Sequence, residues 1–375
     1  MMRLALKMLM GDRSRYLTLV IGLSLVSFLF VQQGAAFCGI MARISKPIEA
    51  VGAPVWVSDA KLQSIEESRP LPDTDLSRVR SVPGIEWAVP LFLRIVQVRL
   101  HDGTFQNVRL FGLDNNSLIG RPPHMLAGRT SDLFAPDSVI LGLSESDRLG
   151  GPKVGNTFEI NDRLARVVGV ADAARDFVGN PYVYTTYDRA ISFTPPQRKQ
   201  LNFILAAPKE GVSAEALALT IRRATGLGAY TLDDMRWLSI DYTVRNTAFP
   251  VLFAIALLMD FVVGMSVAGQ TLHAFALQNE RFLAALKAMG TGQLTLSLMS
   301  VTQGLTVGLI SFGIGSGAAC LFGYLTGGGT GRLAFYAPWQ LMAVSFGVLI
   351  VICLFSSLFA VRRVLLLEPG VVFRA

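Results

Sequence analysis

Charged residues are scarce in this sequence. Only 16% of the 375 residues are Asp, Glu, Lys or Arg, and 51% are hydrophobic. Soluble domains carry about 25% charged residues, so this balance excludes an ordinary soluble protein and indicates a membrane protein. Many of the basic residues behind the net charge of +7 flank apolar runs. Because no basic stripe with interleaved aromatic residues occurs, we expect no nucleic-acid partner.

Cysteine and histidine are equally scarce. The three cysteines, Cys38, Cys320 and Cys353, lie in or beside apolar runs and lack C-x-x-C spacing. This pattern predicts small buried side chains rather than a metal or redox site. The long polar middle of the chain has no cysteine, so we expect it to fold without disulfides. The three histidines are too scattered for a zinc site of the H-E-x-x-H type.

Motifs for nucleotide binding and catalysis are missing. No G-x-x-x-x-G-K-[ST] loop occurs, and the glycine-rich stretch Gly327–Arg332 has no Lys-Ser/Thr after it, which favours a flexible turn. Asp233 and Asp234 precede a predicted helix start, where N-capping explains them better than paired-carboxylate catalysis. We therefore predict no catalytic residue, no cofactor and no metal site on this chain.

Four apolar runs are long enough to cross a membrane, which takes about 20 residues in a helix. The predicted transmembrane helices are 16–40, 247–273, 294–325 and 338–361. The first run exceeds the apolar region of a signal peptide and has no A-x-A site, so we expect an uncleaved anchor. The third run is long and glycine-rich, which predicts a tilt or a kink.

The basic residues predict the orientation of these helices. They precede the first span, lie between the second and third, and follow the fourth, whereas the loop between the third and fourth holds only Arg332. The positive-inside rule then places both termini of this multi-pass protein in the cytoplasm. The remaining segments are an amphipathic N-terminal segment (1–15), a cytoplasmic helix (274–293), a short outer loop (326–337) and a cytoplasmic tail (362–375).

The segment 41–246 has the composition of a globular domain. FLRIVQVRL and FQNVRLFGL flank a turn at Asp102-Gly103, and TFEINDRLARVVGVAD is centred on Asn161-Asp162; both patterns predict β-hairpins. NFILAAP followed by SAEALALTIRRATG predicts a strand and then a helix. The predicted fold class is therefore an α-helical membrane protein with a mixed α/β extracytoplasmic (periplasmic) domain inserted between transmembrane helices 1 and 2.

The cytoplasmic segment ALQNERFLAALKAMG, residues 276–290, has the spacing of an amphipathic helix. Phe282, Ala285, Leu286 and Met289 fall on one predicted face, and the charged residues lie largely off it. Two interpretations stay open at this point. The helix lies in the membrane interface, or its apolar face enters a groove on a partner protein.

Asp260 lies inside the second predicted span. A charge near the bilayer centre costs at least about 2.5–3.5 kcal/mol, so such residues usually face protein. We predict an intramembrane polar contact, within the bundle or at a subunit seam. A position near the outer interface, or a protonated and hydrogen-bonded carboxyl, is the alternative.

ERFLAALKAMG, followed by VTQGL, resembles the signature of MacB/FtsX-like ABC-transporter permeases. DLSRVRSVPGIEWAVPLF, SVILGLSESDRLGGPKVGNTFEINDRLARVVGVAD and the terminal LEPGVVFR resemble further segments of that family, so the resemblance runs through nearly the whole chain. LKAMG, Gln303 and YVYTTYDRAI are most similar to the DevC-type branch. One position departs from many relatives, since Phe282 stands where they have glutamate.

The resemblance implies a non-catalytic permease subunit that passes ATP-driven motion to the periplasmic domain and exports a hydrophobic or lipid-like substrate, within a tripartite efflux system. The implied partners are a separate ATPase that binds ATP and Mg, a second copy of the chain, a periplasmic membrane-fusion adaptor, an outer-membrane channel and membrane lipid. In this scheme 274–293 is a coupling helix. Its implied ATPase-coupling residues are Glu280, Arg281, Phe282, Leu286, Lys287, Met289 and Gly290.

Three other functions remain open at the level of sequence. FtsX-like signalling to a cell-wall hydrolase uses the same mechanics without transport. Lipoprotein extraction from the outer leaflet is carried out by related permeases. A membrane-anchored sensor or enzyme is disfavoured because no catalytic constellation occurs. The genes beside this one would discriminate most sharply between these classes.

Overall fold

The computed structural model describes residues 13–100, 102–144, 146–151, 153–173, 175–194, 201–327 and 333–366. The chain divides into two compact units. We call Met1–Ile40 together with Ala248–Ala375 the membrane unit, and Met41–Thr247 the α/β domain. The predicted amphipathic N-terminal segment falls almost wholly outside the described residues, as do the proline-containing tail and most of the glycine-rich turn.

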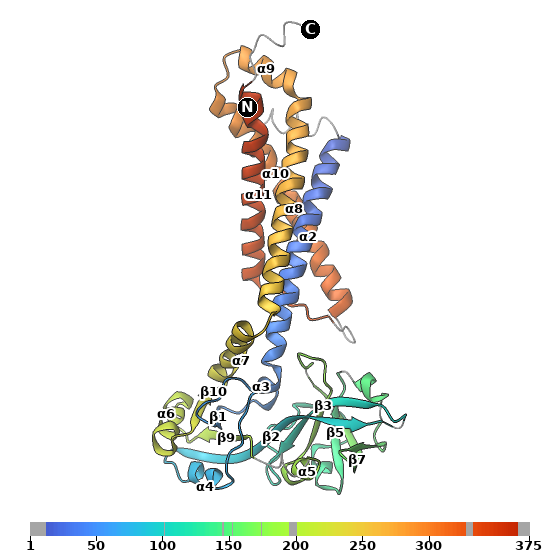
Figure 1. The fold of residues 1–375 in the computed structure, drawn as a ribbon, viewed down its shortest axis with the longest axis vertical. Coiled ribbons are helices and arrows are strands. Elements are labelled where there is room, and N and C mark those ends of the chain that lie inside the picture. Colours follow the sequence, from blue (N-terminus) through green and yellow to red (C-terminus); the bar gives the residue numbers. More distant parts are fainter. Residues whose placement is uncertain are drawn as a thin grey trace. The chain divides into compact units, whose positions relative to one another are not determined.

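The membrane unit is built from four long helices (Figure 1). They are α2 (Arg13–Ile44), α8 (Phe249–Gln278), α10 (Gln293–Gly327) and α11 (Trp339–Leu366). Each is long and apolar enough to cross a membrane, so the prediction of four transmembrane helices is confirmed. The third span, α10, is one continuous helix of 35 residues.

Small residues let these helices approach one another closely. Lipid tails are as apolar as leucine, so helices in a membrane associate through packing and hydrogen bonds rather than through the hydrophobic effect. A Cβ atom added at Gly315 of α10 would overlap the carbonyl oxygen of Ser24 on α2. Close by, the Ser311 hydroxyl donates to the Val20 carbonyl oxygen at 3.1 Å. The contact between α2 and α10 therefore depends on having no side chain at Gly315.

Gly315→Ala is expected to destabilise the membrane unit by about 1–3 kcal/mol, the usual cost of overpacking a close contact. The matched control is Gly313→Ala on the same helix, because a Cβ atom there meets nothing within 4 Å. Both substitutions raise helix propensity by about the same amount, so the difference between them isolates the contact. Thermal unfolding of the full-length protein in detergent measures it. Equal midpoints for the two variants would contradict the packing role of Gly315.

The cysteine prediction is wrong for one residue. Cys353 on α11 is buried and Cys38 on α2 is partly buried, whereas Cys320 is exposed on α10. Hydropathy identified the span but not its exposed side, and Cys320 lies on that side.

The α/β domain contains one ten-stranded sheet. Its strands are β1 (Val55–Ser58), β2 (Ile85–Arg99), β3 (Phe105–Leu113), β4 (His124–Ala127), β5 (Ser138–Gly142), β6 (Thr157–Ile160), β7 (Arg163–Asp172), β8 (Tyr182–Thr186), β9 (Phe203–Pro208) and β10 (Gly228–Thr231). The order is β10-β1-β9-β2-β3-β8-β5-β7-β4, and β6 pairs with β2 and β7. The 15-residue β2 is long enough to pair with β9 along its first part and with β3 along its last.

Short helices complete the domain. They are α3 (Lys46–Val51), α4 (Thr74–Arg80), η1 (Thr130–Phe134), η2 (Ser146–Leu149), α5 (Tyr187–Ser192), α6 (Ala214–Thr225) and α7 (Leu232–Asn246). Figure 1 shows α6 and α4 beside the part of the sheet that contains β1, β9 and β10, and α5 beside the part that contains β3, β5 and β7. The mixed α/β architecture predicted for the segment between the first and second spans is confirmed.

Both predicted hairpins are confirmed. β2 pairs antiparallel with β3, with Arg99 opposite Phe105. β6 pairs with β7 across a two-residue turn, in which Asn161 and Asp162 have φ of +47° and +62°. Two positive φ angles are the signature of a type I′ turn, whose twist matches that of the flanking strands. The predicted strand and helix after residue 202 are β9 and α6.

The start of α7 corrects the prediction about Asp233 and Asp234. The N-cap is Thr231, so both aspartates lie in the first turn of α7 rather than before it. The Thr231 hydroxyl accepts from the Asp234 N–H at 3.1 Å, and the Asp234 carboxylate accepts from the Thr231 N–H at 3.2 Å. This reciprocal capping box confirms that Asp234 caps the helix.

Candidate functional site

The candidate site is α9 (Glu280–Ala288), the short helix between α8 and α10. The backbone conformation of Gly290 explains why α9 ends where it does. Gly290 has φ of +90°, its N–H donates to the Lys287 carbonyl oxygen at 3.0 Å, and the Thr291 N–H donates to the Leu286 carbonyl oxygen at 3.1 Å. These two bonds form a Schellman motif, which needs a residue in the left-handed region. The glycine of the Ala-Met-Gly triplet therefore ends the helix and supplies no side chain to a partner.

One side of α9 is fixed to the transmembrane helices. Leu283 and Leu286 are 7% and 6% exposed and belong to the buried cluster that contains Leu272 of α8 and Leu296 of α10. Leu286 therefore packs against the transmembrane helices and is not on the exposed side of α9, and its coupling role stays a prediction. On a helical wheel Leu286 lies only about 40° from Phe282, so residue spacing could not separate the two.

The other side of α9 is exposed and apolar. Phe282 is 60% exposed and Met289 is 74% exposed, and Ala285 between them is also exposed. We call Phe282, Ala285 and Met289 the α9 surface. Leu294, in the first turn of α10, is also exposed, at 81%. It was not predicted as a site residue, because a leucine at the start of an apolar span looks in the sequence like part of that span.

The structure describes only one of the three charged side chains of the predicted site. Lys287 is partly exposed on α9. Glu280 and Arg281 belong to α9, but their side chains lie outside the described part of the structure. Their predicted roles at an ATPase interface stay predictions.

Asp260 lies on α8, the least buried of the four spans. Its side chain is partly buried, and its Oδ2 atom has no hydrogen-bond partner among the described residues. A contact with a second subunit therefore stays a prediction. The described part of this chain supplies no hydrogen-bond partner to that oxygen.

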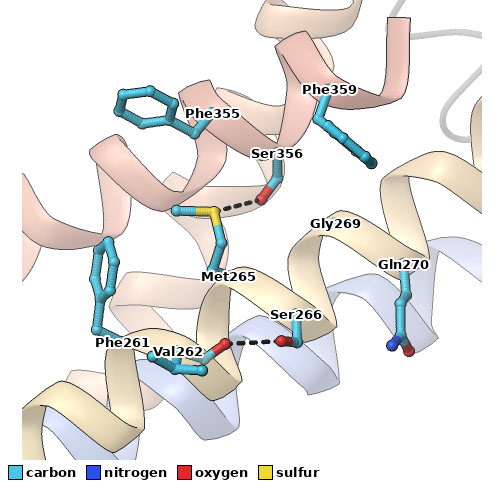
Figure 2. Close-up of a pocket in the computed structure, with 9 residues that line it drawn as sticks. All are labelled: Phe261, Val262, Met265, Ser266, Gly269, Gln270, Phe355, Ser356 and Phe359. Atoms are coloured by element: carbon cyan, nitrogen blue, oxygen red, sulfur yellow. Dashed lines mark hydrogen bonds between the residues drawn. The ribbon is translucent and has the colours of Figure 1, made fainter. Parts of the chain in front are cut away.

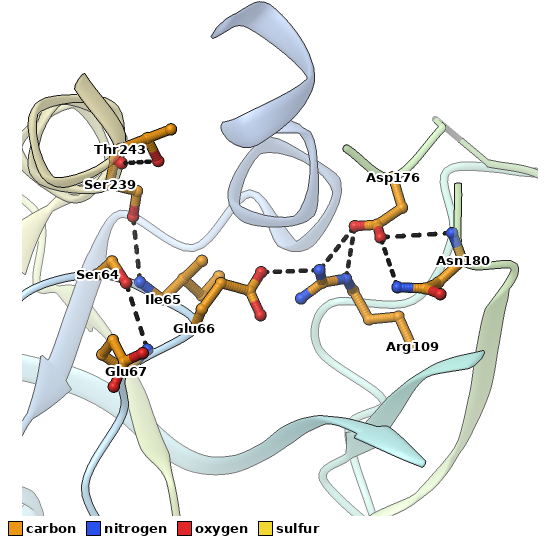
Figure 3. Close-up of polar contacts among 9 residues, drawn as sticks. All are labelled: Ser64, Ile65, Glu66, Glu67, Arg109, Asp176, Asn180, Ser239 and Thr243. Atoms are coloured by element: carbon orange, nitrogen blue, oxygen red, sulfur yellow. Dashed lines mark hydrogen bonds and ion pairs between the residues drawn. The ribbon is translucent and has the colours of Figure 1, made fainter. Parts of the chain in front are cut away.

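The α/β domain contains a buried ionic network that the sequence did not reveal (Figure 3). Arg109 of β3 is 2% exposed, and its Nη2 atom lies 2.7 Å from both Asp176 Oδ1 and Glu66 Oε1. Its Nε atom donates to Asp176 Oδ1 at 2.8 Å, and Asn180 Nδ2 donates to Asp176 Oδ2 at 2.9 Å. Burial alone would lower the pKa of Arg109, but the carboxylates of Glu66 and Asp176 raise it above its ordinary value. The guanidinium therefore stays charged in the core.

This network lies beside a contact with α7. The Ile65 N–H donates to the Ser239 hydroxyl of α7 at 3.2 Å, and the next residue, Glu66, pairs with Arg109. The segment Ser64–Glu66 therefore connects α7 with the centre of the sheet, as Figure 3 shows. Glu66, Arg109 and Asp176 are far apart in the sequence, and no local pattern links them.

A second ionic contact joins α3 and α7. Arg236 Nε lies 3.1 Å from Glu49 Oε1, although this approach is not aligned as a hydrogen bond. Glu49 also accepts from Lys46 Nζ at 2.7 Å and from Ser45 Oγ at 2.9 Å. Burial by itself would raise the pKa of Glu49, but these hydrogen bonds and the charges of Lys46 and Arg236 hold it below its ordinary value.

The Glu49 contacts should therefore weaken on acidification. A carboxylate with a depressed folded-state pKa contributes stability above its unfolded pKa of about 4.3, and loses it as the pH falls through the folded pKa. At pH 7 Glu49→Gln is expected to cost at most about 1 kcal/mol, because the group is partly solvated. Thermal unfolding at a series of pH values should show the wild type and the variant converging below about pH 4. A difference that stays constant across that range would contradict this assignment.

The described residues show no cluster of metal-ligating side chains. No group of three or more His, Cys, Asp and Glu side chains among them could hold a metal ion. The features that the geometry does provide are four membrane-spanning helices, an exposed apolar helix surface and an α/β domain with ionic contacts to α7. Together they define a multi-pass membrane protein with an α/β domain.

Comparisons with known proteins identify the family. Residues 17–224 match the family model described as the MacB-like periplasmic core domain, and residues 251–369 match the FtsX-like permease C-terminal model. The chain belongs to the MacB/FtsX-like ABC-transporter permease family. The family assignment predicted from ERFLAALKAMG and the other segments is thereby confirmed.

Several individual proteins are similar to this chain. Two Mycobacterium tuberculosis proteins, the uncharacterized ABC transporter permeases Rv0072 and MT0078, are 24% identical over 344 residues, covering 89% of this chain and 88% of theirs. Among solved structures, the periplasmic region of MacB from Actinobacillus actinomycetemcomitans is 16% identical, with a TM-score of 0.37, covering 53% of this chain and 96% of that one. The extracellular domain of the noncanonic ABC-type transporter YknZ from Gram-positive bacteria is 12% identical, with a TM-score of 0.35, covering 48% and 99%.

Proposed function

We propose that this chain is the permease subunit of an ABC exporter and that the α9 surface receives the movement of a separate ATPase. The observation that carries the proposal is the division of α9 into two sides. Leu283 and Leu286 fix the helix to the cluster formed by the transmembrane helices, and Phe282 and Met289 on the other side remain uncovered. A force applied to the exposed side would therefore be transmitted to the transmembrane helices rather than dissipated in a flexible loop.

The sequence and the family support a separate ATPase. The chain has no phosphate-binding loop of the Walker type, so ATP and Mg would be bound by another chain. Its family and its Mycobacterium tuberculosis relatives are described as ABC-transporter permeases. In this proposal the protein lies in the cell inner membrane with both termini in the cytoplasm. That orientation rests on the basic residues beside the spans and puts α9 on the ATPase side.

Export would be driven by movement of the α/β domain. In this scheme the domain is periplasmic, two copies of the chain form the working unit, and an adaptor and an outer-membrane channel complete a tripartite system. A hydrophobic or lipid-like substrate, and the resemblance to the DevC-type branch, belong to the same proposal. Its support is the match of residues 17–224, which include most of the α/β domain, to the MacB-like periplasmic core domain model.

Reconstitution with a candidate ATPase tests the proposal. The full-length chain should copurify with the ATPase, and proteoliposomes containing both should couple ATP hydrolysis to a change in the α/β domain, read by a spectroscopic probe there. Affinity capture from membranes then separates the two main classes. Recovery of an adaptor supports export, whereas recovery of a cell-wall hydrolase in its place would replace it with FtsX-like signalling. Failure to bind any ATPase would remove the coupling role of α9.

A further inference from the structure

The membrane unit contains a groove between α8 and α11 that the coupling role does not use (Figure 2). It is lined by α8 residues from Phe261 to Gln270 and by Phe355, Ser356 and Phe359 of α11. Its volume is about 560 Å³, within the range of about 300–1,000 Å³ typical of small-molecule sites. An apolar cavity of about 150 Å³ holds one benzene molecule, so the groove has room for a ligand several times larger.

The walls of the groove suit a hydrocarbon. Three phenylalanines line it, and none of its lining residues carries a charge. At Gly269 a Cβ atom would meet nothing within 4 Å, so open space lies directly over the backbone of α8. Phe355 and Phe359 are 61% and 64% exposed, which means that the groove opens at the side of the helices rather than toward a closed interior.

One buried hydroxyl in the groove has a poor partner. Ser356 is 1% exposed, and its Oγ atom donates to the Met265 sulfur at 3.4 Å. The neighbouring Ser357 instead donates to the Cys353 carbonyl oxygen at 2.6 Å, as serines in membrane helices commonly do. A thioether is a weak acceptor, and the unbranched methionine side chain changes rotamer easily. An oxygen acceptor on a ligand would therefore satisfy Ser356 better than Met265 does.

We propose that this groove binds one acyl chain of a membrane phospholipid. The opening lies on the side of membrane-spanning helices, where acyl chains are the surrounding medium. The phenylalanines and Gly269 contact the hydrocarbon, and Ser356 donates to an ester oxygen of the same lipid when Met265 moves aside. This goes beyond the proposed function, because the lipid would bind whether or not the chain exports a substrate.

Native mass spectrometry of the full-length protein in detergent tests the proposal, with phosphatidylethanolamine as the probe. The wild type is expected to retain one lipid. Gly269→Phe fills the groove and is expected to reduce lipid occupancy at least tenfold. Gly313→Phe on α10 is the matched control, since that glycine also has open space around it, and it should retain the lipid. Ser356→Ala should weaken binding about two- to tenfold, the effect of one neutral hydrogen bond.

Photocrosslinking locates the lipid independently of folding in these variants. A phospholipid with a diazirine in its acyl chain should label Met265 and Phe355 in preference to Leu258, which is 59% exposed elsewhere on α8. Equal labelling of these positions would overturn the proposal, as would lipid retention by Gly269→Phe equal to that of the wild type. Efficient disulfide formation between two copies carrying Phe359→Cys would also overturn it, because a helix of a second copy would then occupy the groove.

Discussion

Replacing Arg109 with leucine is expected to lower the free energy of unfolding of the α/β domain by about 3–5 kcal/mol, the usual cost of breaking a buried ion pair from one side. Asp176 is fully buried, with 0% of its side chain exposed. Without the guanidinium it would still accept hydrogen bonds from Asn180, at 2.9 Å from the side chain and 3.4 Å from the backbone, but these carry no positive charge. The Asp176 carboxylate would then be a poorly compensated charge in the core.

Urea unfolding of the full-length protein measures this effect through tryptophan fluorescence, to which Trp56, fully buried in the same domain, contributes. The control is Glu66→Gln, because the Glu66 side chain is 49% exposed and water can replace much of its contact with Arg109. It should cost about 1 kcal/mol or less. The double variant Arg109→Leu with Asp176→Leu should recover part of the loss, since apolar pairs replace buried ion pairs well. A double variant less stable than Arg109→Leu alone would show that packing, and not an uncompensated charge, causes the loss.

Phe282→Asp and Met289→Asp are each expected to reduce binding of the partner ATPase at least about thirtyfold, the loss typical of an interface hot spot. Phe282 is 60% exposed and Met289 is 74% exposed, so a carboxylate at either position is well solvated in the free protein. Docking would strip that solvation from the charge without supplying a partner for it. ATP-driven export should fall with binding, and copurification and transport in proteoliposomes measure the two effects.

Controls separate docking from folding. Phe105→Asp changes a phenylalanine of similar exposure, 66%, in the α/β domain, and should leave ATPase binding unchanged. Leu286→Asp should reduce the amount of folded protein, because Leu286 is only 6% exposed and packs against the transmembrane helices. Met289→Leu keeps an apolar side chain of similar volume and should retain binding. Normal ATPase binding and export by both aspartate variants would rule out the α9 surface as the coupling site.

Several parts of the fold could be predicted because they depend on local sequence. The four spans follow from the length of chain that a bilayer requires, and the structure contains four helices that meet this requirement. The turn at Asn161-Asp162 predicts its own hairpin, because both residues tolerate positive φ and the flanking strands alternate in polarity. The family match was predictable for a related reason, since its motifs occur in order along the chain.

The ionic network in the α/β domain could not be predicted in this way. Arg109 and Asp176 are 67 positions apart, and Glu66 comes from a segment without regular structure. Each looks in the sequence like an ordinary surface charge. Only the tertiary fold around β3 brings both carboxylates within 2.7 Å of the Arg109 guanidinium.

One part of the candidate site could be predicted from local sequence, and another part depended on tertiary packing. Spacing along the chain identified α9 as a short amphipathic helix, and the positive φ of Gly290 explains why it ends where it does. Spacing also assigned Leu286 and Phe282 to the same face, although one is 6% and the other 60% exposed. The sequence was enough for the spans, the hairpins and the existence of α9, because these depend on neighbouring residues and on the surrounding medium. Tertiary packing decided which side of α9 stays free, which charges meet in the core and where α8 and α11 leave a groove, because each depends on contacts between distant parts of the chain.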